Sequence, residues 1–126
     1  SGVLAIASVR FGADFAIGID VNTAGLIAAN TNARRNRIEN QTQFLSTPLA
    51  EISGDYDVVI ANIHDDILRD MADDLVARVA SNGWLGLSGV SPGQLSRLRA
   101  AFPQIIFEEP RKMDDWNALI GRRKIE

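Results

Sequence analysis

The sequence predicts an α/β fold with a Rossmann-like, doubly wound sheet that is mostly parallel and ends in an antiparallel C-terminal hairpin. Three observations support this prediction. Short apolar runs alternate with segments of helical spacing along the 126 residues, as in parallel sheets covered by helices. The last two runs, 104–107 and 116–120, are joined by a charged connection that is too short for a parallel crossover. Polar side chains, Asp20 and Asn62, follow two of the most apolar runs.

Length and composition indicate one globular domain. A chain of 126 residues suits a single domain of the usual ~100–200 residues, and a hydrophobic content of 46% supports a core. A net charge of -3 gives no electrostatic reason to expect nucleic-acid binding. The chain has no cysteine, which excludes disulfides and thiolate chemistry. No run approaches the ~20 apolar residues of a membrane span and no signal peptide is visible, so we expect a soluble, cytoplasmic protein.

The first part of the chain predicts two helices and two strands. An apolar helix that is buried on most sides is expected to end at Gly12, where a C-cap glycine is favoured. The continuous apolar run 15–19 predicts a strand covered on both faces. A second helix is expected over 22–36, and 41–45 is a weaker strand. The candidates for the N-cap of the second helix are Asn22 and Thr23.

The second part of the chain contains the most apolar strand, 56–61, which is followed directly by Asn62. Apolar residues at helical spacing then predict one helix from about 65 to 79. Asn82-Gly83 ends this helix, and 84–88 predicts another buried strand. Ser91-Pro92 marks the start of a further helix, because proline is favoured in a first helical turn.

Two residues near the start of the chain have the spacing of a nucleotide-binding half-site. Gly2 begins the first helix, whose free N–H groups can bind a polar ligand, and Asp20 ends the next strand, where a carboxylate can accept hydrogen bonds from ribose hydroxyls. The spacing is close to the ~20 residues of dinucleotide fingerprints. Asp20 and Asn62 are also favoured residue types for turns and helix caps. Because both follow buried strands, and a glycine-led helix precedes them, a ligand site is favoured over two separate caps.

His64 is the single histidine and has Asp65 and Asp66 beside it. Adjacent residues point in different directions on a helix, so these side chains do not form a metal-ligand set. We therefore expect a surface histidine in a first helical turn and no metal. A nucleophile elbow with a Ser–His–acid order is absent, which argues against a hydrolase.

Several blocks of sequence resemble, in order, the class I S-adenosylmethionine (SAM) methyltransferases, and specifically the bacterial ribosomal protein L-eleven methyltransferases, the PrmA family. The blocks are Ser1-Gly2-Val3-Leu4-Ala5-Ile6-Ala7, Gly12-Ala13, Ile17-Gly18-Ile19-Asp20, Asp57-Val58-Val59-Ile60-Ala61-Asn62-Ile63, Leu85-Gly86-Leu87-Ser88-Gly89-Val90 and Asp115-Trp116 through Ile120-Gly121-Arg122-Arg123-Lys124. The similarity extends over essentially the whole chain.

This resemblance implies a seven-stranded sheet with a reversed last strand, and SAM as the cofactor. It places Ser1 and Gly2 beside the methionine part of SAM, Asp20 on the ribose hydroxyls and Val21 against the adenine. Asn62 would bind the cofactor beside the transferable methyl and would receive the substrate amine as the catalytic residue. The implied substrate is an amine nitrogen, of a lysine side chain or an N-terminus, in a large-subunit ribosomal protein.

The sequence also departs from that family pattern. The family's first strand, the acid-plus-glycine turn and an N-terminal substrate-recognition domain have no counterpart before Ser1. We therefore expect residues 1–126 to be one SAM-binding domain that is truncated at its N-terminus. The strand that is missing would lie centrally, between 15–19 and 56–61, and a folded monomer hardly tolerates such a gap. The expectation is a longer protein, or another segment that fills the gap.

Two other functions fit parts of the sequence. A nicotinamide dehydrogenase also has a glycine-led helix and an acid after its second strand, but the antiparallel last strand and the Asn62-Ile63 pair argue against it. A non-catalytic methyltransferase-fold remnant that serves as an interaction module is the third possibility, since half of the glycine loop is absent.

Overall fold

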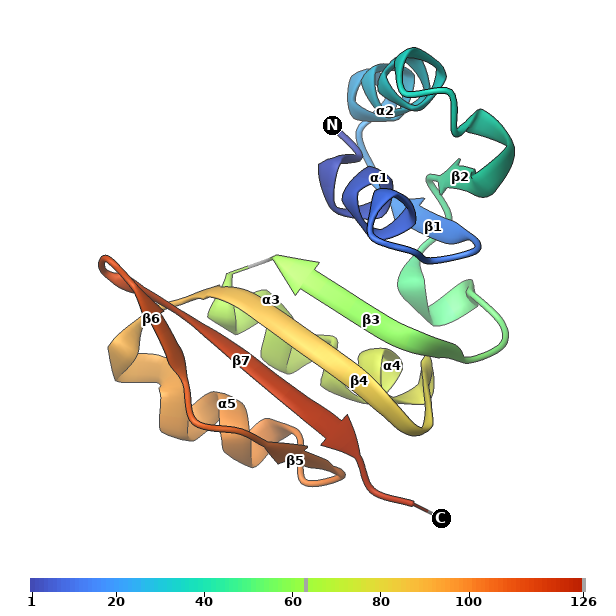
Figure 1. Cartoon of the computed structure of the whole chain (residues 1–126). Coiled ribbons are helices and arrows are strands. Elements are labelled where there is room, and N and C mark those ends of the chain that lie inside the picture. Colours follow the sequence, from blue (N-terminus) through green and yellow to red (C-terminus); the bar gives the residue numbers. More distant parts are fainter. Residues whose placement is uncertain (63, 126) are drawn as a thin grey trace. The chain divides into compact units, whose positions relative to one another are not determined.

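The computed structural model describes residues 1–62 and 64–125 and separates into two compact units, Ser1–Ile52 and Ser53–Glu126 (Figure 1). Each unit has its own sheet, and helices alternate with strands in both. The predicted α/β class is thus confirmed, whereas the single domain inferred from chain length stays a prediction. Among the described helices, none combines the length and the apolarity needed to cross a bilayer.

The first unit is a helix followed by a β–α–β arrangement. Its elements are α1 (Val3–Arg10), β1 (Ala16–Ile19), α2 (Thr23–Arg35) and β2 (Thr42–Leu45), with 3-10 turns at Glu39–Gln41 and Leu49–Glu51. The two strands pair in parallel, from Ala16 opposite Thr42 to Ile19 opposite Leu45. A parallel pair needs a long connection between its strands, and α2 provides it.

The core of the first unit is formed by one side of each helix, by both strands and by the segment after α2. Its buried residues are Ile6, Val9, Ala33 and Ile38, with Ala16 and Phe44 packed against them. The sequence suggested a first helix buried on most sides, and this expectation was wrong. One side of α1 packs inward, while Phe11 at its C-cap is 92% exposed.

The start of α2 follows the predicted capping pattern. Asn22 is the N-cap with an extended backbone, and its side-chain oxygen accepts a hydrogen bond from the Gly25 N–H at 3.2 Å. This bond satisfies one of the free donors of the first turn. At the other end, Arg34 and Arg35 lie in the last turn, where the helix dipole favours positive charge.

The second unit contains a sheet with one reversed strand and with helices packed against it (Figure 1). Its strands are β3 (Tyr56–Asn62), β4 (Val79–Val90), β5 (Ile105–Phe107), β6 (Arg111–Met113) and β7 (Trp116–Arg123), and its helices are α3 (Asp65–Asp70), α4 (Ala72–Ala77) and α5 (Leu95–Ala101), the last preceded by a 3-10 turn at Pro92–Gln94. The order is β3-β4-β7-β5, and β6 pairs with β7. β3 and β4 are parallel, whereas β7 is antiparallel to β4, β5 and β6. The predicted antiparallel C-terminal strand is confirmed.

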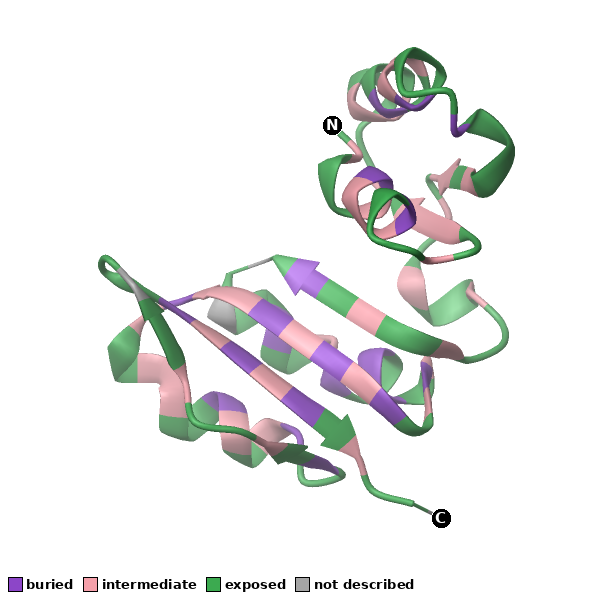
Figure 2. Cartoon of the chain, in the orientation of Figure 1, coloured by how far each residue is buried: buried purple, intermediate pink, exposed green. Residues whose placement is uncertain are grey.

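The two faces of this sheet differ in burial. Buried and partly exposed residues alternate along β4 and β7 (Figure 2), as the two-residue period of a strand requires. Leu85, Leu87 and Leu119 form a core with the buried residues of the helices. On the opposite face, Val58 of β3 is 54% exposed and Ile106 of β5 is 62% exposed. Helices α3 to α5 thus cover one face of this sheet.

The helix predicted over 65–79 is two short helices in the structure, so this prediction was wrong. α3 and α4 meet at Met71, whose ψ of 2° is not helical. The Arg123 guanidinium of β7 binds one carbonyl in the last turn of α4 and one at the start of β4. Its Nη1 donates to the Val76 oxygen at 2.8 Å and to the Val79 oxygen at 2.7 Å, so carbonyls left free by the helix end are satisfied.

β4 is also longer than the predicted strand 84–88. It begins at Val79 opposite Tyr56, and its register with β3 shifts before Trp84 pairs with Val58. Asn82 lies in this irregular stretch with a φ of 63°. The Asn82-Gly83 pair therefore bends the start of a strand and does not end a helix.

The described strands form two separate sheets, which bears on the expected central gap. β1 pairs with β2, and β3 pairs with β4. In the part of the chain that the structure describes, β1 and β3 are not paired with each other, so each has one edge without a strand. The expected gap and the truncation of the domain stay predictions.

We expect Phe102→Ala to destabilise the second unit by about 3–5 kcal/mol, because the ring is fully buried and its removal leaves a cavity. Phe11→Ala is the matched control and should change stability by less than about 0.5 kcal/mol. Urea unfolding followed by circular dichroism measures both. Equal losses for the two variants would contradict the packing described here.

Candidate functional site

The start of α1 and the end of β1 are held at the same edge of the first unit by the ring of Phe44. A β-carbon built on Gly2 would lie 2.8 Å from Cβ of Ala29 and 2.9 Å from Cε1 of Phe44. A β-carbon built on Gly18 would lie 2.6 Å from Cδ1 of the same ring. Both glycines are therefore packed against Phe44, and the helix start lies beside the carboxyl half of the strand.

The N-terminus of α1 has free hydrogen-bond donors. Gly2 is the N-cap with a φ of 75°, and α1 has neither a side-chain cap nor an acidic residue in its first turn. Its first-turn N–H groups and the positive end of the helix dipole are thus not neutralised by an N-cap side chain or a first-turn acid. The Ser1 carbonyl accepts a hydrogen bond from the Asn32 amide of α2 at 3.1 Å, which fixes the entry into the helix.

Asp20 follows β1 and has one carboxylate oxygen committed to its own turn. Oδ1 accepts a hydrogen bond from the Asn22 N–H at 2.9 Å. Asp20 therefore stabilises a turn, which is one of the two roles that the sequence suggested for it. The carboxylate lies over Gly25, since a β-carbon there would be 2.2 Å from Oδ2. Oδ2 has no hydrogen-bond partner among the described residues, and a carboxylate oxygen can accept from an external hydroxyl.

Val21 follows Asp20 and is 85% exposed. An exposed apolar side chain next to a carboxylate can lie against a flat ring while the carboxylate binds polar groups attached to that ring. Ser1, Gly2, Asp20 and Val21, the residues predicted to bind the cofactor, all lie in the first unit. Gly2 packs against the same ring as Gly18, which lies two residues before Asp20.

Asn62 is the last residue of β3 in the second unit. It lies opposite Ser88 of β4, and its side chain is exposed. A β-carbon built on Gly89 would lie 2.8 Å from its Oδ1. The amide is thus packed over a glycine at the carboxyl end of two parallel strands, the edge at which open α/β sheets bind ligands. Ile63, which follows Asn62 in the motif, lies outside the described residues.

His64 is an exposed residue at the start of α3 and makes no side-chain cap. Asp66 pairs with Arg69 at 2.5 Å. Among the side chains that the structure describes, no three His, Asp or Glu groups converge in a way that could hold a metal ion.

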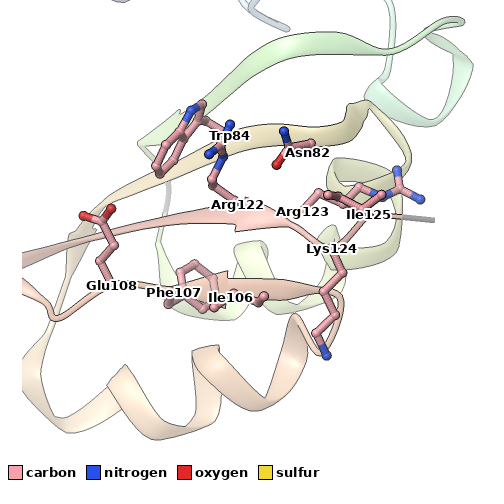
Figure 3. Close-up of a pocket in the computed structure, with 9 residues that line it drawn as sticks. All are labelled: Asn82, Trp84, Ile106, Phe107, Glu108, Arg122, Arg123, Lys124 and Ile125. Carbon is pink, nitrogen blue, oxygen red and sulfur yellow. The ribbon is translucent and has the colours of Figure 1, made fainter.

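A hollow of about 400 Å³ lies elsewhere on the second unit (Figure 3). The guanidinium of Arg122 stacks over the ring of Trp84, 4.7 Å from its centroid, in this hollow. Trp84 pairs with Val58, four residues before Asn62 on β3, which is about 13 Å along the strand. The hollow is therefore at a different place from Asn62. Its lining residues are Asn82, Trp84, Ile106, Phe107, Glu108, Arg122, Arg123, Lys124 and Ile125.

Reasoning from sequence missed the residues that support the predicted ones. Phe44 lies in the strand that was considered weak, yet its ring contacts both Gly2 and Gly18. Gly89 was part of a motif without an assigned role, and it lies under the Asn62 amide. For Gly89 the sequence did contain one signal, because this glycine directly follows Ser88, the polar residue that ends the predicted strand 84–88.

Comparison with known proteins gives a consistent result. A sequence model of the family described as ribosomal protein L11 methyltransferase (PrmA) matches residues 1–124. The ribosomal protein L11 methyltransferase of Pelobacter propionicus is 33% identical over 125 residues, which cover 98% of this chain and 40% of that protein. The chain thus spans about 40% of the length of the curated relatives it matches.

Solved structures agree on the fold. The ribosomal protein L11 methylase of Lactobacillus delbrueckii subsp. bulgaricus superposes with a TM-score of 0.90 at 28% identity, over 98% of this chain and 65% of that chain. The magnesium protoporphyrin IX methyltransferase of Synechocystis PCC 6803, solved with bound SAM, gives a TM-score of 0.76 at 19% identity, over 98% of this chain and 65% of that chain. At this identity the second match supports the fold alone. The predicted Rossmann-like fold of the class I methyltransferase type is confirmed.

We expect Gly2→Ala to destabilise the first unit more than Gly12→Ala does. Both glycines have positive φ, so alanine at either site should lower the free energy of unfolding by about 1–2 kcal/mol. Gly12 has nothing within 4 Å of an added β-carbon, whereas at Gly2 that carbon meets Ala29 and Phe44, which adds about 1–3 kcal/mol. Urea unfolding followed by circular dichroism compares the two. Equal costs would show that the contact with Phe44 is not tight.

Proposed function

The chain belongs to the ribosomal protein L11 methyltransferase (PrmA) family, and on that premise we propose that it is part of a SAM-dependent methyltransferase acting on amine nitrogens of a protein. The observation that carries the proposal is the arrangement where β1 ends. A helix start without a cap, a carboxylate with one free oxygen and an exposed valine lie in one unit. These groups match the charged, hydroxyl and flat apolar parts of SAM.

Each residue of the first unit has a distinct proposed role. Ser1 and Gly2 bind the methionine part of SAM, whose carboxylate is attracted to the free N–H groups of α1. Asp20 accepts hydrogen bonds from the ribose hydroxyls through Oδ2, while Oδ1 keeps the turn to Asn22 in place. Val21 lies against the adenine.

Asn62 is the proposed catalytic residue and also contacts the cofactor. SAM, when bound, supplies a methyl group on a positively charged sulfur, which a nitrogen lone pair can accept. The Asn62 amide oxygen accepts a hydrogen bond from the incoming amine and thereby orients its lone pair. Such transfer depends on an in-line approach of the two atoms, so orientation is the main contribution of the protein.

The proposed substrate is an amine of a lysine side chain or of an N-terminus in a ribosomal protein of the large subunit. The relatives are named for ribosomal protein L11, which supports a ribosomal protein here as well. We place the protein in the cytoplasm for the same reason, with no direct binding to nucleic acid, which agrees with the net charge of -3.

We expect Asp20→Asn to weaken SAM binding by about 10- to 100-fold. Asparagine can keep the turn to Asn22 but loses the charge and the Oδ2 acceptor, and a hydrogen bond to a charged group contributes about 1.5–3 kcal/mol. Isothermal calorimetry with the protein that carries this chain measures the affinity. Asp14→Ala is the control and should not change the affinity, because Asp14 is an exposed acid in the turn before β1. Equal affinity of Asp20→Asn and wild type would remove Asp20 from the site.

Thermal unfolding with added nucleotides separates the proposed cofactor from the nicotinamide alternative. We expect SAM to raise the unfolding temperature and NAD to leave it unchanged, because ligand binding to the native state stabilises it. Protection by NAD and not by SAM would favour a dehydrogenase. Absence of protection by either, in the full protein, would favour the non-catalytic interaction module.

A further inference from the structure

Gly89 of β4 lies under the side chain of Asn62. The two strands are in register here, with Asn62 opposite Ser88, so Gly89 is the next residue along the neighbouring strand. A β-carbon on Gly89 would be 2.8 Å from the Asn62 Oδ1, closer than the 3.0 Å that β-carbons essentially never pass. The amide oxygen therefore occupies space that any other residue at this position would fill.

The backbone at Gly89 is held from both sides. Ser88 is paired with Asn62, and Val90 on the other side is fully buried. Between them Gly89 has a φ of 74°, and the register of β4 with β7 shifts at this point. The neighbour of a new β-carbon is the end of a flexible side chain, so the Asn62 amide would be displaced more readily than the backbone of β4.

The Asn62 amide has few other restraints. It is exposed, and among the described residues it has no hydrogen-bond partner. Its Oδ1 lies in the space that a β-carbon on Gly89 would fill, so a side chain at Gly89 would exclude this orientation of the amide.

We propose that Gly89 is a positioning residue for methyl transfer, because it leaves the space in which the Asn62 amide is oriented toward the substrate amine. This inference rests on the function proposed for Asn62. A side chain at Gly89 would rotate the amide away, and the oxygen would no longer direct the nitrogen lone pair. Gly89 itself need not touch substrate or cofactor.

The test compares Gly89→Ala with Gly54→Ala. Gly54 is in the same unit, has a φ of 82° and has nothing within 4 Å of an added β-carbon. Both variants place alanine in a left-handed conformation, so both should lower the unfolding temperature to a similar extent. Gly89→Ala should lower kcat for methyl transfer by about 100-fold, the loss expected from a displacement of about 1 Å, while Gly54→Ala should leave it unchanged. Equal activity of the two variants would overturn the proposal.

A double-mutant cycle separates positioning from a general structural defect. In an Asn62→Ala background there is no amide to displace, so Gly89→Ala should have no further effect on kcat. The same fold-loss in both backgrounds would show that Gly89 acts independently of Asn62. If Gly89→Ala does not fold, Gly89→Asn replaces it, because asparagine tolerates positive φ and still carries the β-carbon.

Nuclear magnetic resonance tests the contact without any assay of activity. The side-chain NH2 signals of Asn62 should shift in Gly89→Ala and remain in place in Gly54→Ala. If the wild-type protein transfers no methyl group but the Asn62 signals still shift in Gly89→Ala, the proposed function is rejected. The contact between Asn62 and Gly89 is then still supported. Unshifted Asn62 signals in Gly89→Ala would reject the positioning role even if the enzyme is active.

Discussion

The contact between one aromatic ring and two glycines determines the arrangement of the first unit. Phe44 packs where Gly2 and Gly18 have no side chains, so a helix start and a strand end lie together at one edge. Asp20 and Val21 follow that strand directly. This contact acts together with the bond from Asn32 to the Ser1 carbonyl to hold the start of α1 beside the strand that leads to Asp20.

The second unit depends on long-range contacts of its reversed last strand. β7 lies between β4 and β5 and pairs with both, and its Arg123 binds carbonyls at the end of α4 and the start of β4. β7 thereby completes the sheet, and its Arg123 also donates a hydrogen bond to a carbonyl in the last turn of α4. The carboxyl ends of β3 and β4 are held in register by this sheet, and Asn62 and Gly89 lie at those ends.

Local signals in the sequence predicted much of this fold, and long-range contacts account for what they missed. The Asn22 cap and the terminal antiparallel strand depend on neighbouring residues and were correct. The carbonyls at the end of α4 are bound by Arg123, 47 residues from Val76, and no local pattern contains that information. For the candidate site, the sequence placed Asp20 and Asn62 after strands. The packing of Phe44 and Gly89 against site residues exists only once strands distant in sequence are side by side.

The distribution of aromatic residues has a practical consequence. Both tryptophans, Trp84 and Trp116, and the one tyrosine, Tyr56, lie on strands of the second unit, and residues 1–52 contain neither type. Intrinsic fluorescence therefore reports on the second unit alone, whereas far-ultraviolet circular dichroism reports on the helices of both. If the two unfolding curves coincide, the two units unfold in one cooperative transition. If they do not coincide, the units unfold separately. The chain carries its own optical probe of coupling between its two units, without any added label.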